Sequence, residues 1–269
     1  EHALRAGADM VQTAPLDLDF SLPAFDLYRG LKYGVLITSF GCPFRCEYCA
    51  SSALEPLYKA RPRDLTMADA ITQLASGEVR DLAFYDDALL WDKRSRLYPL
   101  LERLKPWGAR LHTPNGLHVR EIDDEYAAIL KKSGFQTIRL SFESSDALIQ
   151  HKGSDKVSED EYMAALDSLK RAGFSERSLE TYILAGVPGQ SVDSVERSIR
   201  FVRRAGGLPR IAEFSPVPGT VSFEEAAEAM PALREEPLLS NKTAYSSWLS
   251  GAMTPAELQG LKDLAKKGR

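Results

Sequence analysis

Short apolar and β-branched runs recur along the chain, and each has the length of a buried strand. Between them, apolar residues recur every three or four positions, which is the spacing of one helix face. Six runs are therefore predicted to be strands: Tyr33–Ser39, Asp81–Tyr85, Arg110–Thr113, Thr137–Phe142, Leu179–Leu184 and Ile211–Ser215.

Capping signals mark the helices between these strands. Ser158 with Glu161 has the form of a capping box, and Thr66 with Asp69 is predicted to start a helix in a similar way. Further helices are predicted from apolar stripes, N-terminal caps and terminal glycines, within Leu97–Leu104, Asp123–Gly134, Ser158–Gly173 and Val192–Ala205.

Six strand–helix repeats in series predict a parallel sheet with right-handed crossovers. The pattern alone is compatible both with an open, doubly wound sheet and with a barrel. In both architectures, reactive groups gather at the carboxyl ends of the strands. The segments that directly follow the predicted strands are therefore the places where chemistry is expected.

Composition and charge narrow the class of protein. The 269 residues are enough for one large core, and the net charge is −4, with Lys and Arg scattered along the chain. A nucleic acid is therefore not expected as a partner. Because no apolar run has transmembrane length and the first residues lack the pattern of a signal peptide, we expect no membrane partner and a cytoplasmic location.

All three cysteines of the chain, Cys42, Cys46 and Cys49, directly follow the first predicted strand. Three thiolates at this spacing suit a cubane [4Fe–4S] cluster whose fourth iron has no protein ligand. A structural zinc site would need a second pair of ligands. A disulfide framework would need an even number of cysteines, and a thioredoxin-like pair would need only two. The open cluster is therefore the prediction.

The stretch Cys42-x3-Cys46-x-Tyr48-Cys49 resembles the signature of the radical S-adenosylmethionine (SAM) superfamily. The resemblance implies that the three cysteines bind a [4Fe–4S] cluster and that its open iron binds SAM. It further implies a partial (β/α)6 TIM-like barrel with a parallel sheet, and it places Tyr48 beside the adenine of SAM. The implied reaction is reductive cleavage of SAM to a 5′-deoxyadenosyl radical, which takes a hydrogen atom from a substrate.

Further matches to this superfamily follow the second and fourth predicted strands. Asp86 and Asp87 stand where the family usually has Gly-Gly-Glu, which holds the SAM amine; Asp86 is preferred for this contact, with helix capping as the alternative. Alternation along the fourth strand places Arg139, Ser141 and Glu143 on one face. The resemblance implies that Ser141 and Glu143 hold polar groups of SAM, and the alternative is a structural ion pair between Arg139 and Glu143.

Glycine-rich turns follow the fifth and sixth predicted strands. The turn Gly186-Val-Pro-Gly-Gln190 resembles the one with which the family holds adenine, so Gly186 is assigned to SAM binding, and Gln190 replaces the usual acidic residue. The Pro-Gly-Thr turn at residues 218–220 resembles the one after the sixth strand of many family members. Together the matches span residues 33–220.

The segment that begins at the end of the third predicted strand contains His112, His118 and Arg120 around a Pro/Gly turn. A histidine at this position can contact substrate or satisfy a neighbouring backbone group, and the sequence leaves both interpretations open.

Three parts are predicted along the chain: a lead-in at residues 1–32, the core barrel at 33–220 and a C-terminal helical cap at 221–269 over the open side of the barrel. The core most resembles radical SAM cores that follow a cobalamin-binding domain. Residues 1–12 are compatible with the last helix and strand of such an upstream α/β domain. The segment before the barrel is too short for a Rossmann-type domain, so no cobalamin site is expected in this chain.

The leading functional hypothesis is a radical SAM enzyme that acts on a small or medium-sized organic substrate and takes electrons from a reductant such as a flavodoxin or ferredoxin. No cysteine remains for an auxiliary cluster, which disfavours methylthiotransferases. One alternative is the catalytic part of a cobalamin-dependent methyltransferase or rearrangement enzyme. Another is a non-catalytic iron–sulfur protein that transfers electrons or senses redox state.

Overall fold

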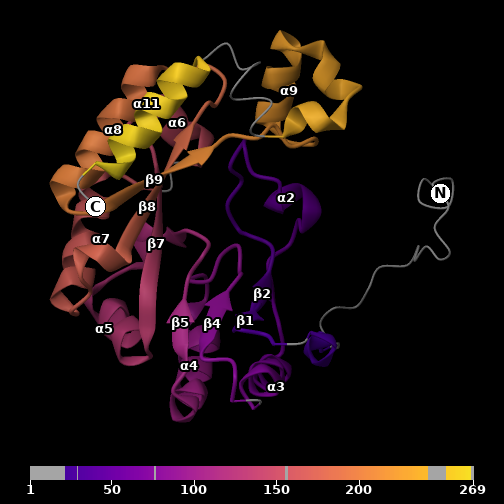
Figure 1. Cartoon of the computed structure of the whole chain (residues 1–269), viewed down its shortest axis with the longest axis vertical. Helices are drawn as coiled ribbons and strands as arrows, with labels where there is room; N and C mark the ends of the chain where they lie inside the picture. Colours follow the sequence, from indigo (N-terminus) through magenta and orange to yellow (C-terminus); the bar gives the residue numbers. More distant parts are fainter. Residues whose placement is uncertain (1–21, 29, 76, 155–156, 242–252, 268–269) are drawn as a thin grey trace, which may run out of the picture.

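The computed structural model describes residues 22–28, 30–75, 77–154, 157–241 and 253–267. Its centre is one parallel sheet (Figure 1). The strands of its main path, in spatial order, are β1 (Tyr33–Leu36), β4 (Asp81–Phe84), β5 (Arg110–His112), β7 (Phe135–Glu143), β8 (Leu179–Ala185) and β9 (Leu208–Glu213). A short strand, β6 (Leu117–His118), also pairs with β7, and β2 (Ser39–Phe40) forms a separate antiparallel pair with β3 (Lys59–Ala60).

The strand order distinguishes a barrel from a doubly wound sheet. Spatial order follows chain order from β1 to β9, whereas a doubly wound sheet reverses direction at a switch point. Right-handed crossovers that all run one way place the helices on one face and curve the sheet toward closure. Since β1 and β9 remain the two edges of the sheet, the predicted partial barrel is confirmed.

Helices cover the outer face of the sheet. Among them, α3, α5, α8 and α11 contact the strands (Figure 1). The α-helices are α2 (Ser51–Leu54), α3 (Arg63–Leu74), α4 (Tyr98–Leu104), α5 (Asp124–Lys132), α6 (Ala147–Lys152), α7 (Glu159–Arg171), α8 (Val192–Ala205), α9 (Val221–Ala229) and α11 (Pro255–Lys266). Short 3-10 turns occur at Phe25–Leu27, Lys105–Trp107, Val119–Glu121, Glu176–Ser178, Pro231–Arg234 and Pro237–Ser240, and a π turn at Lys93–Leu97.

The predicted helix starts agree with the structure in all but one case. The capping box of Ser158 and Glu161 opens α7 as predicted. The predicted start at Thr66 is wrong, because α3 already begins at Arg63, directly after Pro62. Thr66 lies inside the helix, where its hydroxyl donates to the Pro62 carbonyl at 3.0 Å, a back-bond common for threonine within helices.

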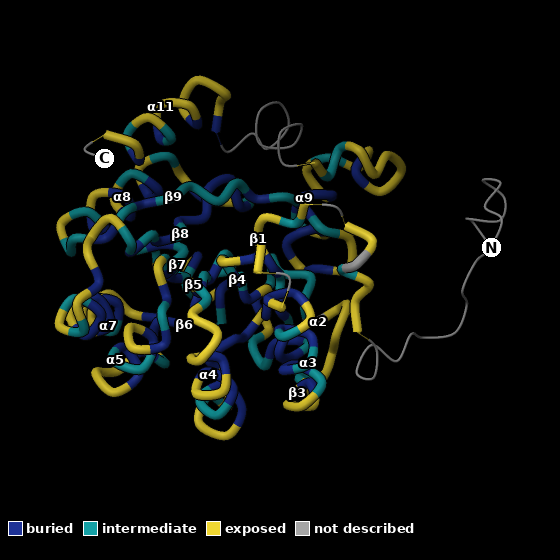
Figure 2. Tube along the Cα trace, turned by 60° about the horizontal axis from the view of Figure 1, so that its bottom comes forward, coloured by how far each residue is buried: buried dark blue, intermediate teal, exposed yellow. Residues whose placement is uncertain are grey.

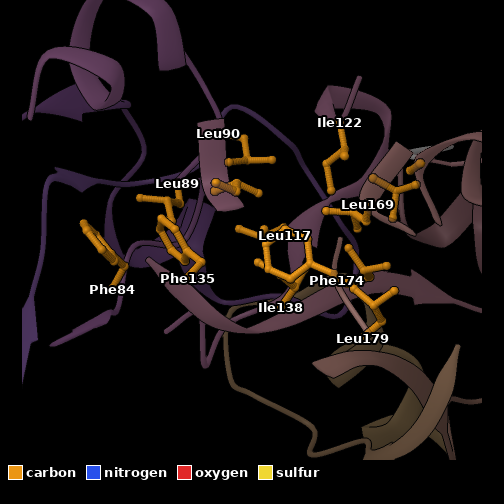
Figure 3. Packing of buried hydrophobic residues seen from close by; sticks show 14 of the residues in the cluster. Phe84, Leu89, Leu90, Leu117, Ile122, Phe135, Ile138, Leu169, Phe174 and Leu179 are labelled. Carbon is orange, nitrogen blue, oxygen red and sulfur yellow. The ribbon is translucent and has the colours of Figure 1, made fainter. Parts of the chain in front are cut away.

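The hydrophobic core lies between the outer face of the sheet and these helices, and includes Phe84, Phe135, Ile138 and Leu169 (Figure 3). From Thr137 to Glu143 in β7, half-buried and buried residues alternate, as a strand with two different faces requires. In Figure 2 the central strands are mostly buried or intermediate, and exposed residues are frequent on the surrounding helices. The inner face of the sheet is thus left for polar groups.

The C-terminal region has two different placements. Helix α11 packs against α8 and β9 through Leu258, Leu261 and Ala265, so it extends the outer helical layer at the β9 edge. Helix α9 instead lies beside the cysteine loop, where the Ser222 amide donates to the Glu47 carbonyl at 3.0 Å. The expected boundaries at residues 32 and 220 stay predictions, and the expectation for residues 1–12 lies outside the described residues.

No helix within the described ranges combines the length and the apolar character needed to cross a bilayer.

Candidate active site

The cysteine loop follows β1 and turns sharply at Gly41. Gly41 has a φ of +71°, which favours glycine, and a Cβ there would lie 2.6 Å from the Leu57 carbonyl oxygen. Cys42 and Cys46 are buried and Cys49 is half-buried. The Cys49 amide donates to the Cys46 carbonyl at 3.1 Å, which fixes the second half of the loop as a turn.

One side of the loop is held by α6 and α9. The Glu47 amide donates to the Lys152 carbonyl at 2.8 Å, and the buried Lys152 ammonium pairs with Glu225 at 2.5 Å and with Glu47 at 3.4 Å. The Cys46 sulfur lies 3.5 Å from the Gly153 carbonyl oxygen. The two carboxylates around Lys152 therefore tie the middle of the cysteine loop to the end of α6 and to α9.

Asp86 holds the base of the loop. Its carboxylate accepts from the Thr38 amide at 3.1 Å, the Thr38 hydroxyl at 2.6 Å and the Ser39 hydroxyl at 2.7 Å, and the Arg96 guanidinium lies 3.5 Å away. Burial raises the pKa of Asp86, and Arg96 and the hydroxyl groups oppose that rise. Asp86 is thus engaged within the protein, and the structure does not bring it to the cavity described next.

A cavity of about 350 Å³ opens in front of the cysteine loop, and all three cysteines line it. The predicted residues Tyr48, Ser141 and Glu143 also line it. Asp87, the residue after Asp86, lines the cavity as well. The carboxylate that faces the cavity at the end of β4 is therefore that of Asp87. The structure therefore brings together six of the eight predicted site residues.

Tyr48 forms part of the cavity wall between two of the cysteines. Its hydroxyl is buried without a hydrogen-bond partner within 3.5 Å among the described N and O atoms, and a Cβ on Gly153 would lie 3.1 Å from it. Burial, followed by the nearby Glu143 and Cys46, raises the pKa of Tyr48 far above its ordinary value. Tyr48 therefore stays a neutral phenol beside the thiol groups.

Glu143 lies at the end of β7 with a φ of +67°, a conformation that is uncommon for residues other than glycine. The pairing of β7 with β8 shifts register between Ser141 and Glu143. Backbone strain of this kind is concentrated at functional sites. Arg139, the partner required for the alternative ion pair, is bonded instead to Glu180 at 3.0 Å.

The turn after β8 is held in shape by the side chain of Gln190, which belongs to the turn. Gln190 accepts from the Gly186 amide at 2.9 Å and donates to the Leu184 carbonyl at 2.9 Å, and it is buried. Among the described residues that line the cavity, neither Gly186 nor Gln190 is found. The positive φ of Gly186, +92°, fits the sharp turn. Its assignment to SAM binding stays a prediction.

The polar residues at and after the end of β5 have separate roles. His112 bonds to Asp81 at 2.8 Å and to Thr137 at 3.0 Å, and Arg120 pairs with Glu161 at the surface. His118 lines the cavity, and its ring stacks on Phe44 with the ring centres 4.2 Å apart. Of the two histidines, only His118 is in a position to meet a ligand in this cavity.

Asn115 and Gly116 are among the cavity residues that the sequence did not point to, because turn chemistry alone accounts for both residue types. Asn115 donates from its side chain to the carbonyls of Tyr85 and Asp86, both at 3.1 Å, and so links the loops after β4 and β5. A Cβ on Gly116 would lie 2.1 Å from the Ser141 hydroxyl, so only glycine lets this loop approach β7. Their position directly after a strand was the available signal.

The arrangement of the donor groups fits a cluster and does not fit a single metal ion. No three His, Cys, Asp or Glu side chains among the described residues converge closely enough to hold one ion. Each thiolate of a cubane binds a different iron, so three sulfurs around one cavity, rather than around one point, fit a [4Fe–4S] cluster. The Ser141, Glu143 and Asp87 side chains line the same cavity and place hydrogen-bonding groups beside the cysteines.

Sequence comparison decides the family. The profile of the Radical SAM superfamily matches residues 36–202. The chain belongs to the radical SAM superfamily. A [4Fe–4S] cluster on Cys42, Cys46 and Cys49, with SAM as its partner, follows from this membership and confirms the predicted cofactors.

Curated radical SAM relatives are methyltransferases and methylthiotransferases. An "uncharacterized methyltransferase", PH0819 of Pyrococcus horikoshii, is 24% identical over 77% of this chain and 46% of its own length. The ribosomal protein uS12 methylthiotransferase RimO of an Anaeromyxobacter species is 29% identical over 82% of this chain and 47% of its own. The chain thus spans about half the length of these relatives.

Solved radical SAM structures share the fold. The radical SAM methyltransferase TsrM from Kitasatospora setae, solved with cobalamin and a [4Fe–4S] cluster, superposes with a TM-score of 0.62 at 17% identity, over 73% of this chain and 37% of TsrM. Methylornithine synthase gives a TM-score of 0.58 at 17% identity, over 87% of this chain and 62% of its own. At these identities the likeness establishes the barrel and no more.

Proposed function

We propose that this chain is the catalytic core of an enzyme that binds SAM at the cavity and cleaves it reductively. The observation that carries the proposal is that Cys42, Cys46 and Cys49 line the same cavity as Ser141 and Glu143. When bound, the cluster supplies the electron that converts SAM to methionine and a 5′-deoxyadenosyl radical, which takes a hydrogen atom from a small or medium-sized organic substrate.

The residues of the chain bind and orient SAM in this proposal. Asp87 and Glu143 accept hydrogen bonds from the SAM amine, because a bond between an ammonium and a carboxylate is stronger than one between neutral groups. Ser141 bonds to a ribose hydroxyl of SAM. Neutral Tyr48 lies beside the adenine and adds no negative charge next to the thiolates. Asp86 and Lys152 keep the cysteine loop in place from its two sides. A flavodoxin or ferredoxin in the cytoplasm is the proposed electron donor, with neither nucleic acid nor membrane as partner.

The test is anaerobic reconstitution with iron and sulfide, followed by incubation with SAM and dithionite. We expect about four irons per chain, a spectral change on adding SAM, and formation of 5′-deoxyadenosine. Cys46→Ala should lose all three signals. A SAM-responsive cluster in the Cys46→Ala protein would contradict the ligand assignment.

A second candidate function is cobalamin-dependent methyl transfer. It is favoured by curated relatives described as methyltransferases and by the superposition on TsrM, a methyltransferase solved with cobalamin. Because the chain spans less than half of these relatives, the cobalamin would be bound by another part of a longer protein. Titrating the reconstituted chain with hydroxocobalamin and desalting it separates the two: no retained cobalamin is expected, and stoichiometric retention would place the cobalamin site within this chain.

A further inference from the structure

The inner face of the sheet carries three charged residues below the cavity. Arg139 pairs in register with Glu180, and Ser141 pairs with Tyr182, on the neighbouring strands β7 and β8. Since residues two apart on a strand share a face, Arg139 and Glu180 share the face of Ser141 and Tyr182, which line the cavity. Arg210 of β9 pairs with Tyr182.

These three residues, Arg139, Glu180 and Arg210, form an interior charge cluster. Glu180 accepts from Nε of Arg139 at 3.0 Å and from Nε of Arg210 at 2.8 Å. Nη1 of Arg139 also donates to the Pro114 carbonyl and the Tyr182 hydroxyl, both at 3.1 Å. Because Pro114 and Tyr182 belong to the cavity wall, the cluster is bonded directly to that wall.

The cluster carries an excess positive charge. Burial raises the pKa of Glu180, but the hydrogen bonds from Arg210 and Arg139 outweigh it and lower the pKa below its ordinary value, so Glu180 is a carboxylate. Two guanidinium groups thus share one carboxylate. Of the other acids on the sheet, Asp81 is engaged by Arg110 and His112, and Glu143 lies at the end of β7, where it lines the cavity.

The arginines of the cluster retain donors and access for a ligand. The side chains of Arg139 and Arg210 are 33% and 40% exposed, and that of Glu180 is 14% exposed. Nη2 of Arg139 and Nη1 of Arg210 have no acceptor among the described residues. Since β9 is an edge of the sheet, Arg210 also lies where the partial barrel is open. A half-buried excess charge is costly unless an anion joins it.

We propose that the interior charge cluster binds an oxyanion, a carboxylate or phosphate group, of the organic substrate and so anchors that substrate inside the barrel, below the SAM site. The inference rests on the proposed function in one respect, namely that a substrate enters this cavity. Arginine forks match the two oxygens of such groups, and fixing the anionic end directs the rest of the molecule toward the cavity.

The probes are inorganic phosphate and acetate, each titrated into the anaerobically reconstituted chain at constant ionic strength, with chloride as the balancing anion. The readout is the midpoint of thermal unfolding. The wild-type chain should show a saturable rise with at least one probe, and the tighter of the two identifies the kind of oxyanion. Arg200→Gln, which removes an exposed arginine paired with Glu196 on α8, is the matched control and should behave as wild type.

Variants of the cluster should shift the apparent dissociation constant in opposite directions. Arg210→Gln should weaken anion binding roughly tenfold, because one charge-assisted bond is lost. Glu180→Gln should strengthen it, because the competing carboxylate is removed, an effect that a purely structural ion network does not produce. If Glu180→Gln fails to fold, the comparison of Arg210→Gln with Arg200→Gln decides.

The absence of a saturable effect in the wild-type chain, or equal binding by Arg210→Gln and wild type, would overturn the inference. The same preparations are also incubated with SAM and dithionite without substrate. Formation of 5′-deoxyadenosine without anion binding would reject the charge cluster and leave the proposed function standing. Anion binding without formation of 5′-deoxyadenosine would reject the proposed function and leave the anion site standing.

Discussion

The outer and inner faces of β7 meet opposite physical demands within one strand. On the outer face, Ile138, Leu140 and Phe142 are fully buried in the hydrophobic core. On the inner face, Ser141 and Glu143 line the cavity in front of the cysteine loop, and Glu143 is held at a positive φ. Because the side-chain period of a strand is two, residues with stability and ligand roles alternate along the chain. Substitutions on the two faces should therefore have separable effects.

The largest effect on stability is expected for Phe142→Ala. The Phe142 ring packs against Tyr162 and Phe201, with ring centres 4.8 and 5.1 Å apart. Its removal leaves a cavity in the outer core and should lower the free energy of unfolding by about 3–5 kcal/mol, measured by urea unfolding. Met163→Ala on the exposed side of α7 is the control, with little change. A Phe142→Ala protein with normal stability and weakened SAM binding would break the division between the faces.

The next largest effect is expected for Gly116→Ala, which pushes the loop after β5 against the inner face. The new methyl group would overlap the Ser141 hydroxyl, so the loop or Ser141 must shift, at a cost of about 1–3 kcal/mol. SAM affinity, measured by calorimetry, should fall with it. Gly260→Ala is the control, because nothing lies within 4 Å of the added Cβ on α11. Unchanged SAM affinity in Gly116→Ala would contradict the expected coupling between this loop and SAM binding.

Glu143→Gln tests the inner face without changing its shape. If the carboxylate bonds to the SAM amine, the variant should keep its fold and cluster, while SAM binding weakens by about 1–2 kcal/mol, because a charge-assisted bond becomes a neutral one. The exposed Glu228→Gln serves as control. Loss of stability with unchanged SAM affinity would instead assign Glu143 a structural role.

The smallest effect concerns the pH dependence of the interior charge cluster. The pKa of Glu180 is lowered from its ordinary value of 4.5, so its contribution to stability is fully present above pH 4.5 and is lost as the pH falls through the lowered pKa. Solvent screening limits this contribution to about 1 kcal/mol. Urea unfolding at pH 7 and below pH 4.5 should give a smaller acid loss for Glu180→Gln than for wild type. An equal loss would show that other carboxylates dominate.

The strands and most helices could be predicted from sequence because their signals are local. Apolar runs placed every strand of the main path, and the capping box placed the start of α7. The predicted start at Thr66 was wrong because Pro62 and Thr66 are both residue types that favour a helix start. The helix begins directly after Pro62, the earlier of the two. The short strand β6 has two residues, too few for any periodicity to appear.

The site was predictable only as far as residue type and strand position determine it. The three cysteines, Ser141 and Glu143 follow from spacing and alternation. The choice between Asp86 and Asp87 cannot be made in this way. Strand β4 ends at Phe84, and the alternation of side chains does not predict where residues beyond the strand point. Asp86 turns inward because Thr38 and Ser39, which lie 48 and 47 positions away, offer it hydroxyl groups. Such long-range partners leave no trace in local sequence.

The contacts around the cysteine loop determine when during synthesis the cluster site becomes complete. The Cys46 sulfur meets the Gly153 carbonyl from 107 positions along the chain, and the Glu47 carbonyl accepts from Ser222, which comes still later. A ribosome that has released the chain only as far as residue 100 has delivered all three thiols, but neither α6 nor α9 has been made. The contacts that close the cluster site therefore form only when most of the barrel has been made, and until then the three thiols lack these partners.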